Sequence, residues 1–347
     1  MELFIPGRLC LFGEHSDWAA QYRQVNSNIE PGYAIVIGTN QGISAKVQVH
    51  HNLLFKTICC SQTLELAMDE TLLLAMAKTE NFYSYVAGVA YEALVRYEVG
   101  GLFVDNYAMN LPLKKGLSSS AAICVLVARA FNRLYNLGLS IEEEMDLAYW
   151  GERRTPSQCG RLDQACAYGS QPILIAFEGD RTEIDPLTVG ENLYLIIIDL
   201  AGSKDTQTIL AQLNQCYPVA DNATSAGVQK YLGEINAHLI QQAVSALHQG
   251  DGVALGKLMT QAQAQFDRYL IRACPSQLQA PILHQLLAHP PLQPYIYGGK
   301  GVGSQGDGTA QFIARDRSSR STAISIIARD FPQMQCYELD IPTTTNN

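Results

Sequence analysis

The pattern of apolar and polar positions predicts a chain of short strands and amphipathic helices. Leu3 to Ile5 is an apolar run that ends at Pro6-Gly7, which predicts a strand entering a turn. Apolar runs and alternation rich in β-branched residues predict further strands at 34–39, 43–50, 53–60, 102–107, 171–178, 181–184, 193–200, 295–297 and 334–341. Apolar positions at helical spacing predict helices at 71–96, 121–135, 141–154, 223–249, 253–271, 275–287 and 321–331, with one more that begins near Ser203 or Asp205.

The length of the chain predicts two domains. Its 347 residues exceed what one compact core usually holds. The apolar strand LYLIIIDL, at 193–200, follows a predicted hairpin. We therefore expect an N-terminal domain at 1–189 and a C-terminal domain at 190–347.

Composition is that of a globular protein and narrows the choice of partners. The chain is 47% hydrophobic and 16% charged, and its formal net charge is −9. That charge argues against nucleic acid or an anionic membrane as the main partner, but one local basic pocket is enough for an anionic metabolite. No apolar run is long enough to span a bilayer. The nine cysteines are scattered without zinc spacing, so Cys10, Cys124 and Cys166 are expected to be buried thiols in a reducing cytoplasm.

The stretch PLKKGLSSSAA, at 112–122, precedes a strong helix pattern. Serines before a helix can cap it, and the positive amino end of a helix favours an anion. A phosphate site built from backbone N–H groups is one interpretation, and a simple capped helix is the other.

Three further segments carry candidate chemistry. Arg8, Glu14, His15 and Asp17 lie close together in RLCLFGEHSDW, where hydrogen-bonding side chains suit a polyol. Asp163 lies in a glycine-flanked segment, as a candidate base or as a helix cap. A third stretch, GGKGVGSQGDG, has glycines dense enough to permit close approach of a ligand to the backbone. No GxxxxGK[ST], HRD or DFG motif is present, which excludes P-loop and protein kinases.

Taken together, PGRLCLFGEHSDW, PLKKGLSSSAA and GGKGVGSQGDG resemble the three motifs of the GHMP kinase superfamily, in the same order. GEHSDW, GRLDQ and NFYSYVAGV are most similar to the galactokinase-like sugar kinases. The resemblance implies an α+β fold, with a ribosomal-S5-domain-2-like N-terminal domain and a ferredoxin-like C-terminal domain. It also implies transfer of the γ-phosphate of ATP to a sugar hydroxyl, expected to be the anomeric one, with Mg²⁺ as cofactor. The expected oligomeric state is a monomer or a homodimer.

The resemblance also assigns roles to residues of this chain. Asp163 and Arg8 match the catalytic pair, and Ser120 and Glu152 match the magnesium ligands. Expected contacts of the sugar are Glu14, His15, Asp17, Gly160 and Arg23. Expected contacts of ATP are Lys115, Gly116, Leu117, Ser118, Ser119, Ser120, Ala121, Gly301, Gly303 and Gly306.

Two departures from the galactokinase pattern affect the expected substrate. Trp18-Ala19-Ala20-Gln21 stands where galactokinases have further glycines, and Gln305-Gly306-Asp307 alters the third motif. Asp307 would repel a triphosphate unless it faces away or meets the metal. Arg23 and Arg161 are hypothesised to bind a carboxylate or phosphate on the sugar. The alternatives are a mevalonate-type kinase and a non-catalytic sugar and ATP sensor on the same fold.

Overall fold

The structure is a computed structural model that describes residues 1–111, 116–157 and 159–344. Contacts group the chain into two compact units. The first unit contains Met1–Arg8 and Ile37–Ser170, and the second contains Leu9–Val36 and the chain from Gln171 onward. The division into domains at 1–189 and 190–347 stays a prediction.

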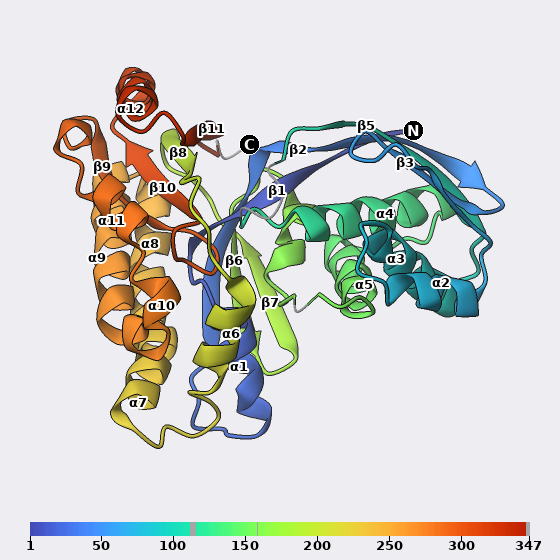
Figure 1. Cartoon of the computed structure of the whole chain (residues 1–347), viewed down its shortest axis with the longest axis horizontal. Coiled ribbons are helices and arrows are strands. Elements are labelled where there is room, and N and C mark those ends of the chain that lie inside the picture. The colour runs from blue at the N-terminus through green and yellow to red at the C-terminus, as the bar shows by residue number, and fades with distance from the viewer. Residues whose placement is uncertain (112–115, 158, 345–347) are drawn as a thin grey trace. The chain divides into compact units, whose positions relative to one another are not determined.

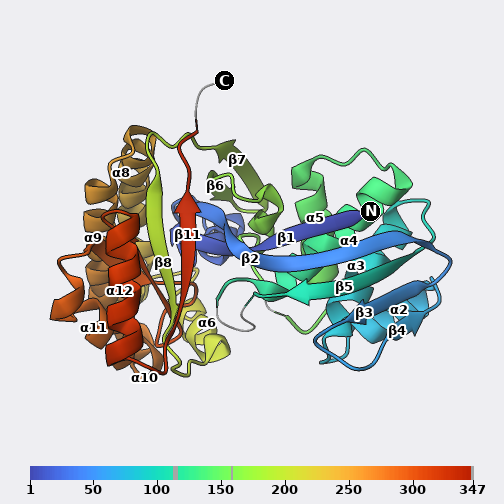
Figure 2. The ribbon, with the colours of Figure 1, turned by 90° about the horizontal axis from the view of Figure 1, so that it is seen from above.

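In the first unit, a sheet is covered by helices on one face. Strands pair in the order β4-β3-β5-β2, where β3 and β5 are parallel and the other pairs are antiparallel. Their bounds are β2 (Gly32–His50), β3 (Leu53–Thr57), β4 (Leu64–Leu66) and β5 (Gly101–Met109), and β1 (Glu2–Phe12) also pairs with β2. Figure 1 shows the helices below these strands, and Figure 2 shows the strands from above. The helices are α2 (Glu70–Ala77), α3 (Tyr83–Arg96), α4 (Ser119–Tyr135) and α5 (Ile141–Arg153).

Glycines let two of these helices touch through their backbones. A Cβ at Gly88 of α3 would lie 2.2 Å from the carbonyl oxygen of Gly151 in α5. A Cβ at Gly151 would lie 2.5 Å from Val89. Both distances are too short for any side chain, so this close packing requires glycine at 88 and at 151. It fixes α5, which carries Glu152, against the core of the unit.

The predicted turn at Pro6-Gly7 is wrong, because β1 continues through it to Phe12. The strand continues because another segment packs on it. The N–H of Arg8 donates to the carbonyl of Leu117 at 3.0 Å, and a Cβ at Gly7 would lie 2.9 Å from the same oxygen. Gly7 is therefore needed for close approach of the segment before α4, and it does not end the strand.

The second unit contains a four-stranded antiparallel sheet and several helices. Its sheet order is β11-β8-β10-β9, from β8 (Leu193–Asp199), β9 (Ile296–Gly301), β10 (Thr309–Ala314) and β11 (Gln335–Ile341). The first residues of β2 pair with β6 (Ile173–Glu178), which forms the predicted hairpin with β7 (Arg181–Pro186). The helices are α1 (Ser16–Gln21), α6 (Thr206–Asn214), α7 (Ala223–Lys230), α8 (Asn236–Gln249), α9 (Gly252–Leu270), α10 (Pro275–Leu278), α11 (Pro281–Leu287) and α12 (Arg317–Asp330).

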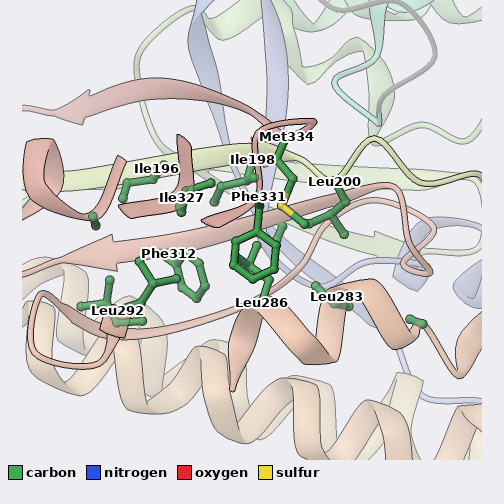
Figure 3. Close-up of a cluster of buried hydrophobic side chains, with 14 residues drawn as sticks. Ile196, Ile198, Leu200, Leu283, Leu286, Leu292, Phe312, Ile327, Phe331 and Met334 are labelled. Carbon is green, nitrogen blue, oxygen red and sulfur yellow. The ribbon is translucent and has the colours of Figure 1, made fainter. Parts of the chain in front are cut away.

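A buried apolar cluster holds helices onto this second sheet. Figure 3 shows side chains of β8 and β10 pointing toward side chains of α11 and α12. The labelled members include Ile196, Ile198, Phe312, Leu286 and Ile327, and these five are at most 1% exposed. Burial of such side chains contributes roughly 1.5–3 kcal/mol each. This cluster anchors the strands that flank the third glycine-rich motif.

Several predicted elements are confirmed and some are divided. The helices predicted at 121–135 and 141–154 are α4 and α5, and Asp205 is the cap of α6. The helix predicted at 71–96 is two helices, and so is the one at 275–287, where Ala280 has a positive φ of 42°. Cys10, Cys124 and Cys166 are buried free thiols, as predicted. No helix in the described ranges combines the length and the apolar character that crossing a membrane needs.

Candidate active site

Within the first unit, the structure brings Arg8 and Asp163 together as an ion pair. Arg8 Nη2 contacts Asp163 Oδ1, and the side chains are 6% and 26% exposed. Arg8 comes from β1, and Asp163 is the first residue of a short 3-10 helix, η2 (Asp163–Tyr168). The arginine is thus almost fully buried while its carboxylate partner remains partly open to solvent. A carboxylate in that position can accept a proton from a ligand.

The start of α4 lies beside this pair. The hydroxyl of Ser118 donates to Asp163 Oδ1 at 2.6 Å. Ser118 is the cap residue of α4, yet its side chain makes no capping hydrogen bond to the helix. The N–H groups of Ser119, Ser120 and Ala121 are in the first turn, where backbone donors lack partners within the helix. That arrangement suits an anion such as a phosphate.

Glu152 is a second carboxylate of this unit, and it is 1% exposed. It accepts hydrogen bonds from Ser157 Oγ at 3.2 Å and from Gln164 Nε2 at 2.9 Å. The pKa of Glu152 is raised to about 7 by burial and, next, by the charge of Asp163, while hydrogen bonds from Ser120 and Gln164 act in the opposite direction. A buried carboxylate next to a hydroxyl and a second acid offers oxygen ligands of the kind that Mg²⁺ prefers.

Burial also keeps the nearby thiols of this unit protonated. The pKa of Cys166 is raised to about 12 by burial, although the charges of Arg8 and Arg129 lower it. The pKa of Cys159 lies well above its usual value, because of burial and then the charge of Glu152. These cysteines are therefore poor nucleophiles.

Other residues of this unit lie around the same region. Gly116 has a positive φ of 77°, and Leu117 is buried at 1% exposure. Gly160 lies in the segment before η2. Arg161 contacts Asp146 at 3.3 Å and lies over the ring of Tyr149. Lys115 lies outside the described residues.

In the second unit, the carboxylate of Glu14 is held by a lysine of the third glycine-rich motif. Lys300 Nζ forms an ion pair with Glu14, and the two side chains are 2% and 5% exposed. Lys300 also donates to the carbonyl of Gly301 at 2.9 Å. The only signal for this role is a lysine within a run of glycines in the third motif. The sequence also did not predict the role of Gln164 in the first unit, where its side chain donates to Glu152. Its only sequence signal is its position next to Asp163.

His15 is a buried neutral residue next to Glu14. Its Nδ1 accepts from Trp18 Nε1 at 3.0 Å, which places the ring proton on Nε2. The pKa of His15 is lowered to about 4 by burial and by the charges of Lys204 and Lys300, while a hydrogen bond to the backbone of Ser304 opposes the shift. Its φ of 71° places it in the left-handed region. His15 is thus a hydrogen-bond donor through Nε2 at neutral pH.

Asp17 and Arg23 are the remaining predicted sugar contacts of this unit. Asp17 is buried within α1. Arg23 donates to the carbonyl of Ile29 and to Glu178 Oε1, the latter at 3.1 Å. Because Glu178 is 67% exposed, this ion pair is weak and easily exchanged.

The third glycine-rich motif is only partly a loop. Gly301 ends β9, and its N–H donates to Gln263 Oε1 at 2.7 Å. Gly303 and Gly306 have positive φ values of 67° and 69°. The carboxylate of Asp307 accepts from the N–H of Leu283 at 2.9 Å, in the first turn of α11. Asp307 therefore stabilises the start of that helix.

In the part of the chain that the structure describes, no three His, Cys, Asp or Glu side chains gather as a metal site. One carboxylate with a hydroxyl, as at Glu152 and Ser120, is a site that phosphate oxygens and water would have to complete.

Comparison with known proteins finds a family model and relatives that this chain resembles. Residues 84–170 match the model of the GHMP kinases N-terminal domain. A galactokinase of Thermococcus kodakarensis is 26% identical over 286 residues, which are 76% of each chain. A galactokinase of Haemophilus influenzae is 26% identical over 288 residues, covering 74% of this chain and 71% of that one.

Solved structures share the fold across nearly the whole chain. Lactococcus lactis galactokinase, complexed with galactose, superposes with a TM-score of 0.74 at 17% identity, covering 99% of this chain and 93% of that one. Methanococcus jannaschii mevalonate kinase superposes with a TM-score of 0.72 at 16% identity, covering 99% and 98%. The mixed α+β fold with two sheets is that of these kinases. The domain match, the galactokinase relatives and the shared fold together confirm the similarity of this chain to the GHMP kinases, with galactokinases among its relatives.

Proposed function

We propose that this chain is an ATP-dependent kinase that transfers the γ-phosphate of ATP to a hydroxyl of a sugar, the anomeric one. The observation that carries the proposal is the contact of Asp163 with both Arg8 and Ser118 at the amino end of α4. A proton acceptor, a fixed cation and free backbone donors for phosphate are what phosphoryl transfer requires. The galactokinase relatives favour a sugar as the acceptor.

In the proposed reaction, Asp163 accepts the proton of the sugar hydroxyl, and the hydroxyl oxygen forms a bond to the γ-phosphorus. The bond from that phosphorus to the bridging oxygen breaks, and ADP leaves with the electron pair. Arg8 stabilises the negative charge that is spread over the moving phosphoryl group. The N–H groups of the first turn of α4 bind phosphate oxygens of ATP.

Mg²⁺ fits the oxygen ligands at the first turn of α4 and in α5. Ser120 and Glu152 would hold it, and the bound ion would neutralise charge on the phosphates. The buried position of Glu152 near Asp163 supports this role, because a buried carboxylate that also faces a second acid is costly without a cation. The remaining proposed ATP contacts are Lys115, Gly116, Leu117, Ser118, Ser119, Ala121, Gly301, Gly303 and Gly306.

The proposed contacts of the sugar are Glu14, His15, Asp17, Gly160 and Arg23. His15 would donate through Nε2 to a hydroxyl oxygen, consistent with its neutral state at pH 7. Arg23 can leave the exposed Glu178 at little cost to bind a carboxylate or phosphate of a substrate. We place the reaction in the cytoplasm, where ATP is available.

A phosphorylation screen tests the proposal. The protein is incubated with ATP and Mg²⁺ and with hexoses, heptoses, pentoses, uronic acids and mevalonate, and phosphorus NMR identifies the product linkage. We expect turnover with a sugar and a product phosphorylated at C1. In Asp163→Asn, kcat should fall about 10²–10⁴-fold, the usual contribution of a general base. Turnover with mevalonate alone would support the mevalonate-kinase alternative, and binding of sugar and ATP without turnover would support the sensor.

A further inference from the structure

Ser118 has an unusual backbone conformation for a helix cap. Its φ of 55° and ψ of 49° lie in the left-handed region, whereas cap residues are normally extended. That region costs an L-residue roughly 1–2 kcal/mol, and glycine avoids the cost. A serine cap normally accepts a hydrogen bond from its own helix, and this one does not. A different contact of the side chain must therefore explain its position.

That contact is Asp163. Ser118 Oγ donates to Asp163 Oδ1 at 2.6 Å, and the neighbouring Leu117 carbonyl accepts from the N–H of Arg8 at 3.0 Å. The segment before α4 is thus tied to both members of the Arg8–Asp163 ion pair. One tie uses the backbone and the other uses the serine hydroxyl.

The two donors leave one oxygen of the carboxylate available. Arg8 Nη2 and Ser118 Oγ both contact Oδ1. Within the described ranges, no side chain or backbone group donates a hydrogen bond to Oδ2 of Asp163. Each carboxylate oxygen can accept two hydrogen bonds. With Oδ1 engaged twice, Oδ2 is the oxygen that can accept from a ligand.

We infer that Ser118 is a positioning residue for the reaction, which holds the carboxylate of Asp163 so that Oδ2 is kept for the acceptor hydroxyl. The inference rests on the proposed function. The serine hydroxyl acts on the base, and the contribution of Ser118 to ATP binding is limited to its backbone. Ser118 also links the phosphate-binding segment to the base, so that both are placed by one short stretch of chain.

Two substitutions separate the hydroxyl from the backbone. Ser118→Gly removes the hydroxyl and relieves the left-handed strain, and Ser118→Ala removes the hydroxyl and keeps the strain. We expect kcat to fall about 10–100-fold in both, as small misplacements of reacting groups do, with KM for ATP changed less than about 2-fold. Wild-type kcat in Ser118→Gly would overturn the inference. So would a raised KM for ATP with unchanged kcat, because it would assign the hydroxyl to the nucleotide.

A double-mutant comparison tests whether Ser118 acts through Asp163. In the Asp163→Asn background, Ser118→Gly should cause little further loss of kcat. An equal loss in both backgrounds would show that the serine acts independently, and would refute the inference. Ser140→Ala is the matched control, since Ser140 caps α5 with its hydroxyl. It should lower the melting temperature and leave kcat unchanged.

A measurement of stability, which needs no substrate, tests this inference independently of the proposed function. Urea unfolding of wild type, Ser118→Ala, Asp163→Asn and the double variant measures the coupling of the two side chains. We expect the two substitutions to be non-additive even if no substrate is found. If the enzyme is active and the two substitutions have additive effects on the free energy of unfolding, only the role of Ser118 is refuted. If the protein is inactive and the effects are non-additive, only the kinase assignment is refuted.

Discussion

Arg8 and Asp163 are 155 positions apart in the sequence, and their side chains form an ion pair in which the arginine is almost fully buried. Arg8 has little freedom to move, because β1 fixes its backbone to Leu117. The geometry is therefore set before any ligand binds. Preorganised charge of this kind is what lowers the barrier of a reaction in which charge moves.

Arg8→Gln should reduce kcat about 10²–10³-fold, because a fixed cation near the moving phosphoryl group is lost. Arg8→Lys should recover part of the rate, since it restores charge without the planar guanidinium. Steady-state kinetics with the substrate found in the screen measures both. Arg129→Gln is the control: Arg129 pairs with Glu144 in the same unit, and both side chains are largely buried. An equal loss of kcat in Arg129→Gln would show that the effect is one of stability.

Lys300→Met should destabilise the protein by about 3–5 kcal/mol, because it leaves the Glu14 carboxylate buried without a cation. Adding Glu14→Gln should recover much of that loss, since the buried charge is removed. Urea unfolding of the two single variants and the double variant measures the coupling. Purely additive effects would show that the ion pair contributes nothing specific.

Asp307→Ala should lower stability by about 0.5–2 kcal/mol, the usual effect of losing a helix cap, because Asp307 accepts from the N–H of Leu283. Asp307→Asn should cost less, because its side-chain oxygen can still accept. Since this carboxylate is used by α11, affinity for ATP should change less than about 2-fold in both variants, a range well below one kcal/mol. Calorimetric titration with ATP and thermal unfolding measure these quantities. Tighter ATP binding by Asp307→Asn would instead show that the acid repels the triphosphate.

His284 should make the protein less stable as the pH rises into the alkaline range. Its hydrogen bond to Asp267 raises the pKa of His284 from 6.5 to about 9, although partial burial opposes the shift. Because the folded pKa lies above the unfolded one, the stabilisation is fully present below pH 6.5 and is lost as pH rises through 9. The free energy of unfolding should therefore fall across that range, and His284→Gln should flatten the fall. A wild-type profile as flat as that of His284→Gln would contradict the assignment.

Local patterns predicted most of the elements correctly. The run 193–200 is apolar because both faces of β8 are covered, and the repeating apolar positions of 121–135 match the buried face of α4. Such signals depend on neighbours in the sequence and are readable from it. Where packing across the chain decides the outcome, the pattern misleads. Gly7 looks like a turn residue, yet it permits the close approach of Leu117.

For the candidate site, too, the sequence indicated the residue types but not the contacts between distant segments. The residue types in the three motifs, and their resemblance to the GHMP kinases, identified Arg8, Ser120, Glu152 and Asp163 as candidates. They did not indicate that the Ser118 hydroxyl donates to Asp163, that Lys300 pairs with Glu14, or that Asp307 caps α11. Each of these contacts joins residues that are at least 24 positions apart, and in each a donor meets an acceptor only after distant segments have packed. A one-dimensional pattern records which side chains can bond, whereas the choice among many possible partners is made by burial, which penalises every polar group left unpaired.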